Sequence, residues 1–154
     1  MNINEMKILL ADDDKDDCIF FKEALGELSL STSLTVVHDG EQLMQLLTRE
    51  NNVLPHILFL DINMPRKNGF ECLSEIKQHK MLNALPVVIF STSFEQEVVN
   101  LLYDNGAQYF IRKPSEFALF KKIILHTLTL ILKENIVQPA REAFVLTAGD
   151  SLPV

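Results

Sequence analysis

The sequence predicts an α/β fold, a doubly wound sheet of five parallel strands with five helices covering both faces. Short apolar runs, typical of strands buried on both faces, alternate with longer amphipathic stretches along nearly the whole chain. Strict alternation of this kind requires parallel strands joined by right-handed crossover helices. The chain has 154 residues, which is enough for one domain with a hydrophobic core.

The first half of the chain supplies three of the expected strands. We expect a strand at residues 7–11 and a helix at about 16–28, whose apolar side chains share one face. The β-branched run at 34–37 predicts the second strand, and a helix opens at Gly40. The third strand, 57–60, is apolar throughout and ends abruptly at Asp61.

The second half continues the alternation. The expected elements are a helix from 70 to about 79 after the Asn68-Gly69 turn, a strand at 87–90, a helix at 95–105, a strand at 108–112 and a last helix from Pro114-Ser115 to about 135. Residues 136–154 form a short tail, in which Phe144, Val145 and Leu146 could dock onto the body. We therefore predict one domain over 1–135, a partly ordered C-terminal tail over 136–154, and no output domain.

The last helix is apolar on more than one face. Beyond the stripe that suits the core, it carries Leu119, Ile123, Leu130 and Leu132. Such a helix is usually buried on a second side too. The hypothesis is a homodimer or partner surface on this helix, and the competing hypothesis is that the tail around Phe144 covers it.

Composition excludes several classes of function. The chain is 47% hydrophobic and 23% charged, with a net charge of −7 and no basic stripe, so we expect no nucleic-acid binding. No apolar run is long enough to span a membrane and no signal-peptide core is present, so we expect a cytoplasmic protein without membrane contact. Cys18 and Cys72 lack metal-type spacing and are interpreted as buried small hydrophobes.

Polar side chains follow four of the expected strands. The first strand ends in Asp12-Asp13-Asp14, the third in Asp61, the fourth in Ser91-Thr92-Ser93 and the fifth in Lys113. In an open doubly wound sheet, functional groups gather at the carboxyl ends of the strands. These side chains should therefore meet at one rim.

The chemistry of this group points to phosphoryl transfer. Clustered carboxylates repel one another, so a cation must screen them or one must be protonated. All-oxygen ligands favour Mg²⁺, and Lys113 could balance Asp61 or meet an incoming anion. Asp61 is the candidate nucleophile that would form an acyl phosphate. Taken alone, the Asp12–Asp14 run could be a solvated helix cap and Lys113 a surface lysine; the four strand ends together disfavour that interpretation.

These residues resemble the receiver domain of two-component response regulators over about residues 7–135. The shared motifs are the acidic pair after the first strand, Leu60-Asp61-x-x-Met64-Pro65 with the following Asn-Gly, the hydroxyl after the fourth strand and Lys113-Pro114. The resemblance implies a flavodoxin-like sheet of order 2-1-3-4-5. It implies that Asp61 is the phosphoacceptor and that Mg²⁺ (or Mn²⁺) is bound by Asp12, Asp13, Asp61 and the backbone carbonyl of Asn63.

The resemblance also assigns the surrounding positions. Ser91 matches the hydroxyl that contacts the phosphoryl group, and Lys113 matches the lysine that pairs with the acceptor. Phe110 falls at the aromatic switch position, although Tyr109 is its neighbour. Thr92, bulkier than is common at its position, is expected to narrow access to Asp61, and Ser93 with Asn63 to tune the acyl-phosphate lifetime. The third acid, Asp14, is expected to cap the first helix.

The implied function is a signalling switch and not an enzyme acting on a separate substrate. A histidine kinase or histidine phosphotransfer protein would phosphorylate Asp61, with self-catalysed, Mg²⁺-dependent phosphorylation and dephosphorylation. The change would alter binding of a downstream protein, which the sequence does not identify, through the face formed by residues 95–105, 108–112 and the last helix.

Three other classes fit less well. A haloacid-dehalogenase-type phosphatase would want an acid where Asn63 stands, together with a larger cap. A flavodoxin-like cofactor binder would want a phosphate-cradling loop in place of Asp12–Asp14. A pseudo-receiver that binds partners without phosphorylation would lack a site position, whereas all are present here.

Overall fold

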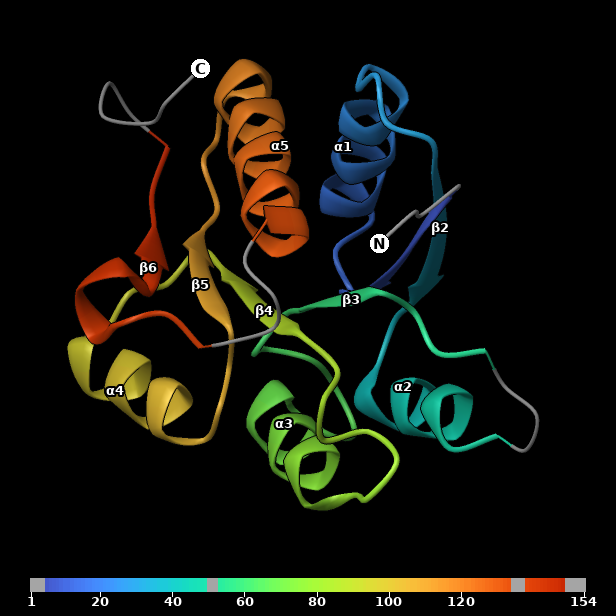
Figure 1. Cartoon of the computed structure of the whole chain (residues 1–154), viewed down its shortest axis with the longest axis vertical. Helices are drawn as coiled ribbons and strands as arrows, with labels where there is room; N and C mark the ends of the chain where they lie inside the picture. The colour runs from blue at the N-terminus through green and yellow to red at the C-terminus, as the bar shows by residue number, and fades with distance from the viewer. Residues whose placement is uncertain (1–4, 50–52, 134–137, 149–154) are drawn as a thin grey trace.

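A computed structural model describes residues 5–49, 53–133 and 138–148 (Figure 1). The elements in chain order are β1 (Met6–Ala11), α1 (Lys15–Gly26), β2 (Thr32–Val37), α2 (Gly40–Leu47), β3 (Ile57–Leu60), α3 (Gly69–Gln78), β4 (Val87–Ser91), α4 (Gln96–Asp104), β5 (Tyr109–Arg112), α5 (Phe117–Lys133), the 3₁₀ turn η1 (Arg141–Ala143) and β6 (Val145–Leu146). The strands form one parallel sheet, with α1 and α5 on one face and α2, α3 and α4 on the other (Figure 1).

The strand order is β2-β1-β3-β4-β5-β6, which confirms the predicted order 2-1-3-4-5 and adds a sixth strand. The sixth strand is the one correction to the predicted five-stranded sheet. Val145 pairs with Phe110 and Leu146 with Ile111 in parallel register. The amide of Phe110 also donates to the carbonyl oxygen of Phe144 at 3.0 Å. A two-residue strand is too short to show a period of two, so only its contact with β5 defines it.

The hydrophobic core has two halves, one on each face of the sheet. Along β1, Ile8 and Leu10 pack with the α1 and α5 side chains, whereas Leu9 and Ala11 pack with those of α2, α3 and α4. Every residue of β3 and β4 is buried. Burial on both faces is why these strands are continuous apolar runs and show no alternation.

The predicted helices and strands are confirmed, with ends that differ by one or two residues. The start of α1 is set by Asp14, whose side chain accepts hydrogen bonds from the amides of Asp16 and Asp17, as predicted for a cap. Asn68 and Glu71 form a capping box at the start of α3. The structure describes α5 to Lys133, so its predicted end near 135 lies outside the described residues.

Residues 138–148, here called the C-terminal segment, pack against α4 and β5. Phe144 is buried, and its ring lies edge-on to Tyr103 with centroids 5.1 Å apart. The side-chain amide of Gln138 donates to the backbone carbonyl oxygens of Tyr103 and Ala107. The Tyr103 hydroxyl donates to the carbonyl oxygen of Pro139 at 2.7 Å. Residues 144–146 thus dock onto the body, which the sequence had left as a possibility, whereas the division at residue 135 stays a prediction.

The second apolar face of α5 is explained in part by the core. Ile123 is fully buried, and Leu146 of the C-terminal segment belongs to the same apolar cluster. Phe144 instead packs on the α4 side. Leu125 and Leu132 remain 39% and 44% exposed, so part of this helix still presents apolar surface. No helix in the described ranges is long and apolar enough to cross a membrane.

Candidate functional site

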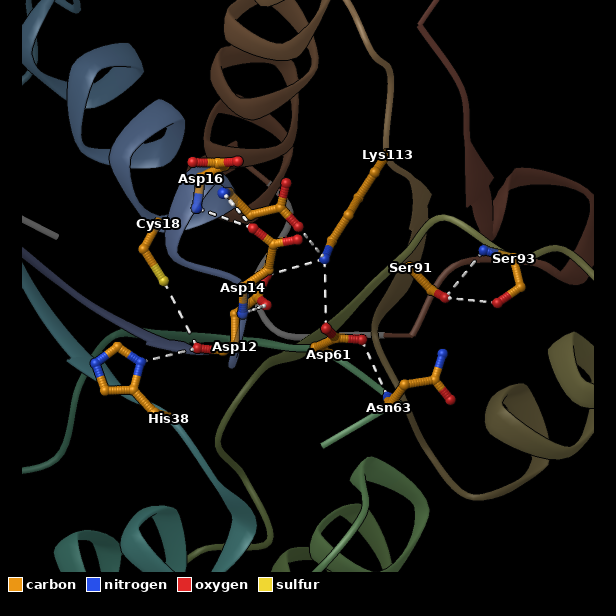
Figure 2. A network of polar contacts seen from close by, with 11 residues as sticks. Asp12, Asp14, Asp16, Cys18, His38, Asp61, Asn63, Ser91, Ser93 and Lys113 are labelled. Atoms are coloured by element: carbon orange, nitrogen blue, oxygen red, sulfur yellow. Dashed lines mark hydrogen bonds and ion pairs between the residues drawn. The ribbon is translucent and has the colours of Figure 1, made fainter. Parts of the chain in front are cut away.

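Four of the predicted site residues, Asp12, Asp61, Ser91 and Lys113, lie at the carboxyl end of the sheet (Figure 2). Asp12 follows β1, Asp61 follows β3, Ser91 closes β4 and Lys113 follows β5. Sheet-type hydrogen bonding extends beyond the strand ends: the amide of Asp61 donates to the carbonyl oxygen of Ala11 at 2.9 Å, and that of Lys113 to Ser91 at 2.9 Å. The backbone of Asp61 and Lys113 is therefore held in place by hydrogen bonds to the sheet.

Three carboxylates form the acidic part of the site. One oxygen from each of Asp12, Asp13 and Asp61 lies within 4.8 Å of the others. Asp12 is fully buried, Asp61 is 6% exposed, and Asp13 faces solvent. Burial raises the pKa of Asp12 to about 7, against the opposing attraction of Lys113. An all-oxygen set of crowded carboxylates, open to water on the Asp13 side, fits a hard divalent cation.

Lys113 is the cationic part of the site. Its ammonium nitrogen lies 2.9 Å from Asp12 Oδ2, 2.7 Å from Asp17 Oδ2 and 3.4 Å from Asp61 Oδ2 (Figure 2). The side chain is only 5% exposed and its nitrogen stands 4.9 Å from the Phe90 ring centroid. Burial alone would lower the pKa of Lys113, but Asp12, Asp61 and the hydrogen bond to Asp17 raise it, so the lysine stays charged.

The sequence did not single out Asp17 as a site residue. It stands in the first turn of α1, and its only sequence signal is that this turn directly follows the Asp12–Asp14 run. His38 and Cys18 were also missed. The His38 ring nitrogen Nδ1 lies 3.1 Å from the backbone oxygen of Asp12, and the Cys18 thiol donates to the same oxygen at 3.6 Å. These two contacts fix the backbone beside the acidic cluster.

The phosphoacceptor candidate is oriented by the loop that follows it. The amide of Asn63 donates to Asp61 Oδ1 at 3.0 Å, and the amide of Gly69 donates to the carbonyl oxygen of Ile62 at 2.8 Å. A Cβ atom at position 69 would stand 2.6 Å from the backbone oxygen of Asp61. Glycine is therefore required for α3 to begin this close to Asp61.

The hydroxyl and aromatic candidates lie on the β4 and β5 side of the site. Ser91 is buried, and its hydroxyl oxygen lies 3.3 Å from that of Ser93 and accepts from the Ser93 amide at 3.2 Å. Thr92 is exposed. Phe110 is buried on the α4 side with its ring edge-on to Phe94, at 6.0 Å between centroids.

Tyr109, the alternative to Phe110, packs in the other half of the core, with the side chains of α1 and α5. Beside Asn63 and Ser93 the surface is hollowed by a cavity of about 150 Å³, which Ile62, Phe70, Glu95 and Val98 also line. The site thus combines buried charges with an open approach from solvent.

Comparison with known proteins agrees with this geometry. Residues 8–125 match the family described as the response regulator receiver domain. The response regulator Rcp1 of Synechocystis sp. is 33% identical over 121 residues, which cover 75% of this chain and 82% of that protein. A probable methanogenesis regulatory protein, FilR2 of Methanothrix harundinacea, is 28% identical over 76% of this chain and 77% of its own.

Solved structures give the same result. The phosphorylated cyanobacterial phytochrome response regulator RcpA superposes with a TM-score of 0.78 at 31% identity, covering 84% of this chain and 95% of its own. The Mn²⁺-bound form of response regulator Rcp1 gives a TM-score of 0.75 at 29% identity over 88% of this chain and 99% of that one.

Proposed function

This chain belongs to the response regulator receiver family and is a two-component signalling protein, and on that premise we propose that Asp61 accepts a phosphoryl group from a histidine kinase or a histidine phosphotransfer protein. The observation that carries the proposal is the meeting of Asp61 with two further carboxylates and one buried ammonium at a single rim of the sheet. The family is one of signalling domains, which supports the proposal.

Asp61 is suited to act as the nucleophile. One carboxylate oxygen accepts a hydrogen bond from the Asn63 backbone amide and the other lies near Lys113, so the group is fixed in orientation. In the transfer, the bond between the donor imidazole nitrogen and phosphorus breaks, and a bond from an Asp61 oxygen to phosphorus forms. The imidazole leaves with a proton from solvent.

A divalent cation, Mg²⁺ or Mn²⁺, fits the cluster of Asp12, Asp13 and Asp61, with the backbone carbonyl of Asn63 as a further ligand in the proposal. When bound, it would supply positive charge against the phosphoryl oxygens. Lys113 contributes the second positive charge, already buried and close to Asp61. The Ser91 hydroxyl would donate a hydrogen bond to the phosphoryl group in place of its contact with the Ser93 hydroxyl.

The switch would then be read on the α4, β5 and α5 side of the molecule. The C-terminal segment already lies on α4 and β5, so a partner that binds this face would meet the segment as well. Phe110, at the expected aromatic switch position, is already buried on the α4 side of the sheet. The exposed Leu125 and Leu132 are compatible with a homodimer through α5, which sedimentation of the full chain tests. The cytoplasmic location stays a prediction.

Incubation with a small phosphodonor and Mg²⁺, followed by intact mass measurement, tests the proposal. We expect the wild-type chain to gain the mass of one phosphoryl group. No gain is expected when a chelator removes Mg²⁺ before the phosphodonor is added. Asp61→Asn should abolish the gain. Asp16→Asn is the matched control, because Asp16 is an exposed aspartate of the same rim and should be phosphorylated normally. An undiminished gain in Asp61→Asn would overturn the assignment.

A further inference from the structure

We propose that Asp17 is a positioning residue that keeps the Lys113 ammonium paired while Asp12 and Asp61 engage a divalent cation. The inference rests on the proposed function, because it concerns the same site. Asp17 stands outside the three carboxylates that cluster within 4.8 Å of one another. It contacts the site through the lysine.

The contact between Asp17 and Lys113 is the shortest of the three that the ammonium makes. The distance is 2.7 Å to Asp17, against 2.9 Å to Asp12 and 3.4 Å to Asp61. An ammonium has three N–H donors and no acceptor, so these three carboxylates can accept all of them. Lys113 is therefore shared between two candidate cation ligands and one carboxylate that is free of that task.

Cation binding changes what Lys113 can pair with. Mg²⁺ or Mn²⁺ held by Asp12 and Asp61 would neutralise part of the negative charge with which those carboxylates stabilise the Lys113 ammonium. The Lys113 side chain is 5% exposed, and a buried ammonium left without counter-charge is strongly destabilised. Asp17 removes this conflict because its carboxylate, 22% exposed, stays available to the ammonium.

The fold holds Asp17 in place for this role. Asp17 lies in the first turn of α1, and its amide donates to the Asp14 side chain at 3.2 Å. The cap therefore fixes the backbone that carries the carboxylate toward Lys113. Asp14 is not one of the three clustered carboxylates, and it bears on the site by capping the helix at this point.

A double-mutant cycle on the full chain separates positioning from simple charge. Binding of Mn²⁺ is measured by electron paramagnetic resonance of the free ion, without any phosphodonor. We expect Asp17→Asn to weaken Mn²⁺ binding about tenfold, as for coupled groups in direct contact. Asp16→Asn removes an equal charge from the neighbouring exposed residue and should change binding by no more than about twofold.

The same substitution is then made in a Lys113→Gln background. If Asp17 acts through the lysine, Asp17→Asn has no further effect there. An equal loss in both backgrounds, or equal losses for Asp17→Asn and Asp16→Asn, would overturn the inference. Should circular dichroism show that Lys113→Gln is unfolded, the comparison of Asp17→Asn with Asp16→Asn still decides.

Failure of this inference differs from failure of the proposed function. If wild type is phosphorylated on Asp61 but the cycle shows no coupling, only the role of Asp17 is wrong. If wild type gains no phosphoryl mass, the proposed function itself is wrong, whatever the Mn²⁺ titrations show.

Discussion

Substituting Phe144 by alanine should destabilise the whole domain, although the residue lies beyond the last long helix. The ring is 1% exposed and packs edge-on against Tyr103 in the α4 half of the core. Truncating a buried phenylalanine costs about 3–5 kcal/mol in free energy of unfolding, depending on how far the site collapses. Because the C-terminal segment lies at the sheet edge and can relax, we expect a loss of about 3 kcal/mol.

Urea unfolding followed by circular dichroism measures this loss. Phe94→Ala is the matched control: the same side chain is removed, but Phe94 is 39% exposed. The control should lose about 1 kcal/mol. If Phe144→Ala lost no more stability than this partly exposed control, the C-terminal segment would not be part of the cooperative fold.

Three further predictions concern the site. Gly69→Ala should slow phosphorylation by at least about tenfold, since the new Cβ pushes on the Asp61 backbone; Gly26→Ala, with nothing within 4 Å of its Cβ, should leave the rate unchanged. Because the pKa of Asp12 is about 7, a cation must displace its proton in acid, so Mn²⁺ affinity should fall about fivefold from pH 7 to pH 6. Asp12→Asn should remove most of this fall, and a fall as steep as in wild type would refute the assignment. Thr92→Ala should speed phosphoryl exchange measured by intact mass, and equal rates would show that Thr92 does not restrict access.

The raised pKa of Asp12 also sets the direction of a stability effect. Between about pH 4 and pH 7 the folded chain holds a proton on Asp12 that the unfolded chain has released. The free energy of unfolding contributed by this group therefore falls as the pH rises through that window. Saturating Mg²⁺ should offset the loss above pH 7, because the cation binds the ionised carboxylate.

The main site could be predicted from sequence because topology does most of the positioning. Parallel strands point their carboxyl ends to one rim, so Asp12, Asp61, Ser91 and Lys113 converge once the alternation is recognised. In the structure Lys113 contacts both Asp12 and Asp61. To predict that these residues converge, it was enough to recognise the strands and the residue at which each one ends.

Asp17 and β6 could not be predicted in the same way. Whether a residue of α1 reaches Lys113, 96 positions away, depends on how the helix packs over the sheet, which no local pattern records. β6 has two residues and is defined by its pairing with β5. Placing Tyr109 and Phe110 also needed the fold. Alternation puts neighbouring residues on opposite faces of the sheet, but it does not say which helices cover each face.

The pairing of β6 with β5 also changes which strand edge of the sheet is open. A five-stranded sheet would end at β5, whose outer row of amides and carbonyls could template pairing with another chain. In this protein the amide of Phe110 is already bonded to Phe144, and Phe110 and Ile111 are paired with β6. The two residues of β6 thus cover part of the edge of β5. Because β6 is only two residues long, it offers another chain a much shorter edge for pairing than β5 would.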